Sequence, residues 1–178
     1  MNCDFVVFDL ETTGLSSRFD EIIQIAAARL GARTAIIGAC GDDADGVALL
    51  ATLAREQVDH SRVQRRSECA TGLAQVLVAD SGENAIVVHS AANGTLRIAE
   101  LDWAPTRVAL AQLETPSATV AEFLRVAREH GAVTLLNPAP ALPQTRALFV
   151  HADVIALSGL FWPQQKMSPE LRRAHVWS

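Results

Sequence analysis

The sequence contains very little lysine. Lys166 is the only lysine among 178 residues, and the formal net charge is −5. Affinity for nucleic acids comes mostly from Lys and Arg side chains that neutralise phosphates, so this composition argues against an extended nucleic-acid contact. The one basic cluster, Arg62–Arg66 ("RVQRR"), follows a helix-like segment and is interpreted as a solvated face.

Long apolar runs are also missing. The sequence has no stretch of about 18 or more uncharged apolar residues, and no basic region stands before the strand-like "FVVF" at Phe5–Phe8. A membrane-spanning helix needs such a stretch, and a secretory signal needs such a region. We therefore expect a cytoplasmic protein without a membrane partner.

Cysteines are few and scattered. Cys3, Cys40 and Cys69 form no CxxC pair and have no Cys/His spacing typical of a zinc site. The pattern favours reduced thiols packed as small hydrophobic side chains over a disulfide framework.

What is present is an apolar chain, 49% hydrophobic, that is long enough for one domain with a core. "TAIIGAC" (Thr34–Cys40) is typical of a buried strand, and "GDDADG" after it supplies turn and N-cap residues. A helix is predicted over Val47–Gln57, with one apolar face that contains Leu49, Leu50, Leu53 and Ala54.

A β-hairpin is predicted next. Leu73–Val78 and Ala85–Val88 are β-rich runs, and "DSGEN" between them has the Asp, Gly and Asn that turns require. Val108–Glu114 is predicted to be a further strand.

The clearest helix lies within residues 115–131. It has a proline and hydroxyl side chains at its start, Gly131 as its stop, and apolar residues at helical spacing, namely Val120, Phe123, Leu124 and Ala127. A strand from Ala132, a helical turn at Pro143–Phe149 and a strand at Ala152–Leu157 follow. Strands that alternate with helices predict a parallel α/β sheet, where ligands gather at the carboxyl ends of strands. Glu114 and Asn137 lie at such ends.

Several motifs resemble the ribokinase (PfkB) family of sugar kinases. They are "AAARLGARTAIIGACGDDADG", "TGLAQVLVADSGENAIVVHSAAN", "QLETP" and "LNPAPALP", in the family's order, and the resemblance covers about residues 26–157. It implies a partial ribokinase-like fold with parallel βαβ units and a β-hairpin lid.

The resemblance also implies site residues. Glu114 becomes the sugar contact, with Asn137 as a second substrate-binding residue. The segment 71–93 becomes a lid that covers the sugar and can form a homodimer, and its candidate residues are Thr71, Gly72, Glu83, Asn84 and Asn93. A carboxylate suits the sugar contact because it accepts strong hydrogen bonds from two neighbouring hydroxyls. Alternatively, Glu114 caps the helix that follows it, and Asn137 only forms a turn before Pro138.

The implied activity is ATP-dependent phosphorylation of a pentose-type sugar with ATP and Mg²⁺. The family's N-terminal part, with a sugar-binding Asp and a Gly-Gly-Lys loop, has no counterpart here. The C-terminal half, whose Gly-Ala-Gly-Asp segment carries the catalytic base beside the nucleotide pocket, has none either. No catalytic base is identified for the kinase. We therefore expect a truncated or fused form that is not competent alone, with a complementing C-terminal kinase chain as a candidate partner.

Residues 4–30 resemble a different family. The stretch "FVVFDLETTGL" is similar to the first motif of the DEDD 3′–5′ exonucleases. Asp9 and Glu11 are two residues apart at a strand end, so their side chains point to one face and can share Mg²⁺ or Mn²⁺. Under this alternative the partner is nucleic acid. The family's further aspartates and histidine have no matching segment in this sequence.

These patterns predict three parts: an exonuclease-like strand pair at 1–30 that is not an independent domain, a ribokinase-like α/β domain at 31–157, and an unassigned tail at 158–178. Residues 22–30 fit either a nuclease strand or the end of a kinase helix. Three functions compete: the sugar kinase, the exonuclease, and a non-catalytic product of gene rearrangement. The kinase resemblance is favoured because it spans about 130 residues against about 27.

Overall fold

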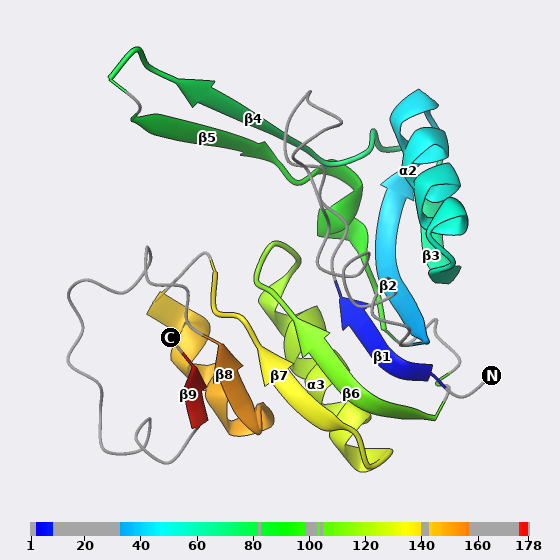
Figure 1. Cartoon of the computed structure of the whole chain (residues 1–178), viewed down its shortest axis with the longest axis vertical. Coiled ribbons are helices and arrows are strands. Elements are labelled where there is room, and N and C mark those ends of the chain that lie inside the picture. Colours follow the sequence, from blue (N-terminus) through cyan, green and yellow to red (C-terminus); the bar gives the residue numbers. More distant parts are fainter. Residues whose placement is uncertain are drawn as a thin grey trace.

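The computed structural model describes residues 3–8, 33–81, 83–98, 103, 105–139, 143–156 and 175–177. Figure 1 shows one large sheet with a helix on each face and a separate hairpin that runs across the end of the sheet. The elements in chain order are β1 (Cys3–Phe8), β2 (Thr34–Gly41), α2 (Ala44–Arg55), β3 (Asp59–Arg66), β4 (Leu73–Val78), β5 (Asn84–His89), η1 (Ala91–Thr95), β6 (Thr106–Ala111), α3 (Ser117–Glu129), β7 (Val133–Leu136), η2 (Pro143–His151), β8 (Val154–Ala156) and β9 (His175–Trp177).

The large sheet has seven strands in the order β3-β2-β1-β6-β7-β8-β9, and every neighbouring pair is parallel. The carboxyl ends of the strands therefore all lie at the same end of the sheet, at the top of Figure 1, which is called its carboxyl edge below. The expected α/β fold with parallel βαβ units is confirmed.

Strand β1 lies in the middle of this sheet. Its backbone pairs with β2 from Phe5 to Phe8 and with β6 from Cys3 to Phe8. The first strand of the exonuclease-like segment is thus part of the same sheet as the kinase-like strands. The second strand expected for a nuclease hairpin, and the helix or strand at 22–30, lie outside the described residues.

Helices α2 and α3 cover opposite faces of the sheet. Side chains alternate along β2: Ala35, Ile37 and Ala39 join the core under α3, whereas Ile36 and Cys40 pack with Leu49 and Leu53 of α2. Alternation along a strand sends successive side chains to opposite faces. Strand β2 is therefore buried on both faces, as its apolar sequence predicts.

Helix α3 follows the predicted pattern closely. Its predicted apolar face is confirmed, because Val120, Phe123, Leu124 and Ala127 are all fully buried. The helix ends at Glu129, and Gly131 then adopts φ +82°, a left-handed conformation that glycine accepts without a steric penalty.

Three predicted boundaries are wrong. Helix α2 begins at Ala44 rather than Val47, because the Asp43 carboxylate caps it by accepting the Gly46 N–H at 2.8 Å. It also ends before Gln57, and Ala54 is exposed rather than part of the buried face. Strand β6 ends at Ala111 instead of Glu114, because the Leu113 N–H turns away to bond the Ala139 carbonyl.

The basic cluster is part of a strand. Arg62–Arg66 belongs to β3, which pairs with β2 at one edge of the sheet, so its interpretation as a solvated face after a helix is incomplete. Its polar sequence, "DHSRVQRR", carries no apolar alternation that would predict a strand. Charged side chains on an edge strand discourage pairing with other chains, and here Arg65 pairs with Asp42 and Arg62 with Asp59.

The predicted β-hairpin is confirmed as β4 and β5, which form a separate antiparallel pair from Leu73↔His89 to Val78↔Asn84. In Figure 1 the hairpin extends from the side of α2 and β3 across the end of the sheet where the strands finish. Every described side chain from Gln75 to Ser90 is exposed.

The cysteines, the absence of long apolar helices and the C-terminal tail can also be compared with the sequence predictions. Cys40 and Cys69 are free thiols, as predicted, and burial raises the pKa of the Cys40 thiol. Within the described ranges, no helix is long and apolar enough to cross a membrane. Part of the tail that had no assignment, His175–Trp177, pairs with β8 as strand β9.

Candidate functional site

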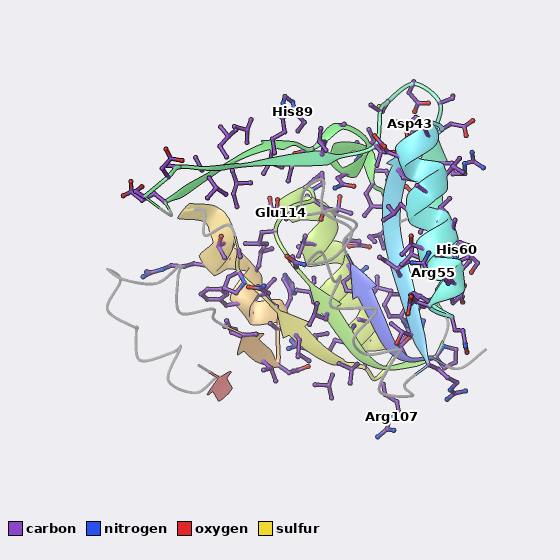
Figure 2. All side chains as sticks on the ribbon, turned by 45° about the horizontal axis from the view of Figure 1, so that its top comes forward. Asp43, Arg55, His60, His89, Arg107 and Glu114 are labelled. Atoms are coloured by element: carbon purple, nitrogen blue, oxygen red, sulfur yellow. The ribbon has the colours of Figure 1, made fainter. Side chains whose placement is uncertain are left out.

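The loops that follow β6 and β7 are held together at the carboxyl edge of the sheet. The Leu113 N–H donates to the Ala139 carbonyl at 3.0 Å, and the Asn137 N–H donates to the Ala111 carbonyl at 2.9 Å. These bonds fix the backbone beside both predicted substrate-binding residues, Glu114 and Asn137. Figure 2 shows Glu114 at this edge, below the hairpin.

Glu114 is partly buried, and its carboxylate has no hydrogen-bond or ion-pair partner among the described residues. It does not cap α3, because the N-cap is Pro116 and no side-chain cap bond forms there. The capping alternative for Glu114 is therefore wrong. Its neighbour Thr115 is 8% exposed, and the Thr115 hydroxyl is buried without a partner within the described part of the chain.

The Thr115 hydroxyl is the less usual of the two. Buried polar groups normally have a hydrogen-bond partner, and an unsatisfied one costs about 1–3 kcal/mol. The Glu114 carboxylate is partly exposed, so water can solvate it, and it is available to a ligand at the carboxyl end of the sheet, where parallel α/β sheets bind their ligands.

Asn137 is partly buried, and within the described ranges only its backbone is hydrogen-bonded. Its side-chain amide could therefore donate to and accept from a ligand. Whether Asn137 binds a ligand or only shapes the turn before Pro138 stays a prediction.

The predicted lid residues fall into two groups. Thr71, Gly72 and Asn93 are buried at the base of the hairpin, where its two strands meet the rest of the molecule. Glu83 and Asn84 lie at the tip, where Glu83 is exposed and accepts a hydrogen bond from the Ser81 hydroxyl at 3.2 Å. The structure brings the first group together and leaves the second group far along the hairpin.

A polar cluster at the base was not anticipated from the sequence. The Asp43 carboxylate accepts the Thr71 hydroxyl at 2.6 Å and the Thr71 N–H at 2.7 Å, in addition to capping α2. These bonds, first the one from the Thr71 hydroxyl, lower the pKa of Asp43. The "GDDADG" motif predicts the cap, but no sequence signal indicates that Thr71 shares the same carboxylate.

The metal hypothesis rests on Asp9 and Glu11, which lie outside the described residues. Within the described ranges, no group of three or more His, Cys, Asp or Glu side chains could hold a metal ion. The described part of the chain therefore does not fit a resident metal.

A model of the pfkB family of carbohydrate kinases matches residues 23–158. This chain belongs to the pfkB carbohydrate kinase family. The match covers both Glu114 and the β4–β5 hairpin, and it leaves the segment that contains Asp9 and Glu11 unaddressed. The exonuclease alternative gains no support from it.

Curated relatives agree with this family. The chain is 38% identical to the ribokinase of Haemophilus influenzae over 136 residues, which is 74% of this chain and 44% of that protein. It is 34% identical to the ribokinase of Schizosaccharomyces pombe over 128 residues, which is 67% of this chain and 40% of that protein. The chain therefore spans less than half the length of these two relatives.

Solved structures share the fold. Ribokinase from Cryptococcus neoformans in complex with ADP superposes with a TM-score of 0.71 at 22% identity, covering 87% of this chain and 58% of that one. Arabidopsis thaliana ribokinase complexed with ribose and ATP gives a TM-score of 0.67 at 19% identity, covering 88% and 60%. At this identity the likeness establishes the ribokinase-like fold alone.

Proposed function

We propose that this chain is the sugar-binding part of a ribokinase-type kinase and that it binds a pentose-type sugar through Glu114. The observation that carries the proposal is the partly buried Glu114 carboxylate, which neither caps α3 nor pairs with any described residue. The names of the curated relatives, ribokinase and deoxyribokinase, favour a five-carbon sugar.

The chemistry of the proposed contact follows from the two oxygens of a carboxylate. They can accept hydrogen bonds from two vicinal hydroxyls, and hydrogen bonds to a charged acceptor are roughly twice as strong as neutral ones. The buried Thr115 hydroxyl and the Asn137 amide offer further polar contacts at the same edge of the sheet. The β4–β5 hairpin would cover the sugar as a lid.

Calorimetric titration with ribose tests this proposal. We expect saturable heat with the unaltered chain and binding at least about tenfold weaker in Glu114→Ala, because hydrogen bonds to a charged group contribute about 1.5–3 kcal/mol. Asn137→Ala should weaken binding less, because a neutral amide contributes about 0.5–1.5 kcal/mol.

Glu122→Ala is the matched control, because Glu122 is an exposed glutamate on α3 that pairs with Arg125 away from the site. Its affinity should equal that of the unaltered chain. Absence of heat with ribose and with other pentoses would contradict the proposal, as would equal weakening by Glu114→Ala and Glu122→Ala.

We further propose that sugar phosphorylation requires residues beyond those of this sequence, on a complementing C-terminal kinase segment. No Gly-Ala-Gly-Asp segment occurs in the 178 residues, and ATP and Mg²⁺ are expected to bind where that segment is supplied. An ADP-release assay with ribose, ATP and Mg²⁺ tests this part. Sugar-dependent ADP formation by the chain alone would contradict it.

The hairpin is also proposed to join two copies of the chain. Both faces carry exposed apolar side chains: Val78, Ile86 and Val88 on one face are 69%, 55% and 43% exposed, and Leu73, Leu77 and Val87 on the other face, which also has Gln75 and His89, are 39%, 60% and 44% exposed. Exposed apolar patches of this kind mark interaction sites. The face with Val78, Ile86 and Val88 is proposed as the contact with a second copy.

A further inference from the structure

Buried contacts of the hairpin lie near its base among the described residues. All the side chains described between Gln75 and Ser90 are exposed, whereas Ala74, close to the base, is buried. The direction of the hairpin must therefore be determined where its two strands leave the rest of the molecule, at residues 70–72 and 90–97.

The entry strand is attached through Asp43. The Thr71 N–H and hydroxyl both donate to the Asp43 carboxylate, at 2.7 and 2.6 Å, and the Thr71 hydroxyl oxygen accepts the Gly41 N–H at 3.0 Å. Thr71 is 8% exposed. One buried side chain thus joins the hairpin to the end of β2 and to the first turn of α2.

The segment that follows β5, through η1 to Arg97, is attached to β3. The Arg66 guanidinium donates to the Thr95 hydroxyl at 3.2 Å. The Gln64 side chain donates to the Arg97 carbonyl at 2.7 Å and accepts the Arg97 N–H at 3.3 Å. Both ends of the hairpin are therefore anchored to the β2–α2–β3 unit.

The two strands also meet each other at the base. The Ala92 N–H donates to the Ala70 carbonyl at 3.0 Å. A Cβ atom at Gly72 would lie 2.9 Å from the side-chain nitrogen of the buried Asn93 and 3.2 Å from the Ser90 carbonyl oxygen, so any larger residue there requires these neighbours to move. Ala91, the first residue of η1, has φ +39°, a conformation that a non-glycine residue adopts only when its surroundings impose it.

We propose that Asp43 is a positioning residue that sets the angle of the hairpin relative to the carboxyl edge of the sheet. Through Asp43 the hairpin and the β2–α2–β3 unit form one body, and this body faces the β6 and β7 loops that carry Glu114 and Asn137. The inference concerns the chain without any ligand, so it stands or falls separately from sugar binding.

Distance measurement between two spin labels tests the proposal. One label is placed at the hairpin tip with Ser81→Cys and one at the start of α3 with Ala118→Cys, both exposed positions. Cys3 and Cys69 are replaced by alanine, and the buried Cys40 is kept. Labelled chain is diluted with an excess of unlabelled chain so that only distances within one molecule are read.

Asp43→Ser is the main variant. Serine still caps a helix well, but its short side chain cannot accept both donors of Thr71. We expect the width of the distance distribution to increase at least twofold. Thr71→Val, which removes the hydroxyl and keeps the backbone, should widen it as well, whereas Thr71→Ser should restore the narrow distribution.

Asp42→Ser is the matched control, because Asp42 neighbours Asp43 but pairs with Arg65 and does not touch the hairpin. Its distribution should equal that of the unaltered chain. Circular dichroism confirms that each variant is folded before labelling. An unchanged distribution in both Asp43→Ser and Thr71→Val, or equal widening in Asp42→Ser, would overturn the proposal.

Discussion

At the scale of single residues, Asp153 joins two elements, β7 and α3. Its carboxylate accepts the N–H and the hydroxyl of Thr134 in β7, at 2.9 and 2.8 Å, and pairs with Arg128 of α3 at 2.7 Å. The Asp153 side chain is 41% exposed, so the ion pair is screened and contributes little. Thr134 is fully buried, so the bonds to it matter more.

Asp153→Ala is expected to lower the free energy of unfolding by about 1–3 kcal/mol, because it leaves the buried Thr134 N–H without its acceptor. The Thr134 hydroxyl can still donate to the His151 carbonyl at 2.8 Å. Urea unfolding measures the change. Glu122→Ala, which removes an exposed ion pair with Arg125, should cost much less, because solvent screens this pair. Equal costs for the two variants would contradict this account.

Asp153 also predicts a pH dependence. Burial raises its pKa, but the Thr134 hydrogen bonds and the Arg128 charge outweigh burial, so its pKa in the folded protein lies below the ordinary value of 3.8. A carboxyl with a lowered folded pKa stabilises the fold above the unfolded pKa and loses this effect as the pH falls through the folded pKa.

We therefore expect the free energy of unfolding to fall below about pH 4, and to fall less steeply in Asp153→Ala. Urea unfolding at a series of pH values from 7 to 3 measures both slopes. Asp43, whose pKa is lowered mainly by the Thr71 hydroxyl, adds a loss of the same sign. Parallel curves for the variant and the unaltered chain would refute the assignment to Asp153.

At the scale of elements, α3 holds the core on its face of the sheet through Phe123. This ring is fully buried and lies 5.6 Å from the ring of Trp103, measured between centroids. Phe123→Ala should lower the free energy of unfolding by about 3–5 kcal/mol, because it removes a large buried side chain and leaves a cavity. Urea unfolding measures this. Ala118→Ser, at an exposed position of the same helix, should have almost no effect.

At the scale of the whole molecule, the proposed contact between hairpins predicts the oligomeric state. We expect a dimer in sedimentation-velocity experiments on the unaltered chain. Ile86→Lys with Val88→Lys should give a monomer, because charges on the proposed contact face of the hairpin oppose its burial. Leu77 lies on the other face, so Leu77→Lys should leave the dimer intact. A monomeric unaltered chain would contradict the proposal.

Part of the candidate site could be predicted from the sequence, and part could not. The position of Glu114 near the end of a strand could be predicted, because the apolar run before it and the helix start after it are both visible in neighbouring residues of the sequence. That Glu114 does not cap α3 depends on the turn made by Leu113 toward Ala139, a contact between loops that no local pattern reports. The Asp43–Thr71 hydrogen bonds join residues 28 apart in the sequence, so no local pattern predicts them either.

The sequence by itself determined the elements that carry strong burial patterns. Strand β2 and the buried face of α3 were predicted because burial on one or two faces constrains which residues stand at each position. The β4–β5 hairpin was predicted from its β-rich runs and from the turn residues between them. The family motifs in the same segments are equally local, so membership in the pfkB family could also be anticipated.

Tertiary structure decided the rest. The chain path placed β1 between β2 and β6, and it made a strand of the polar β3 by pairing it with β2. Pairing in a sheet uses backbone groups that nearly every residue carries, so the side chains of a strand do not by themselves determine which strands pair with it. Local periodicity therefore predicts which segments are strands or helices, whereas only the folded chain determines which segments meet.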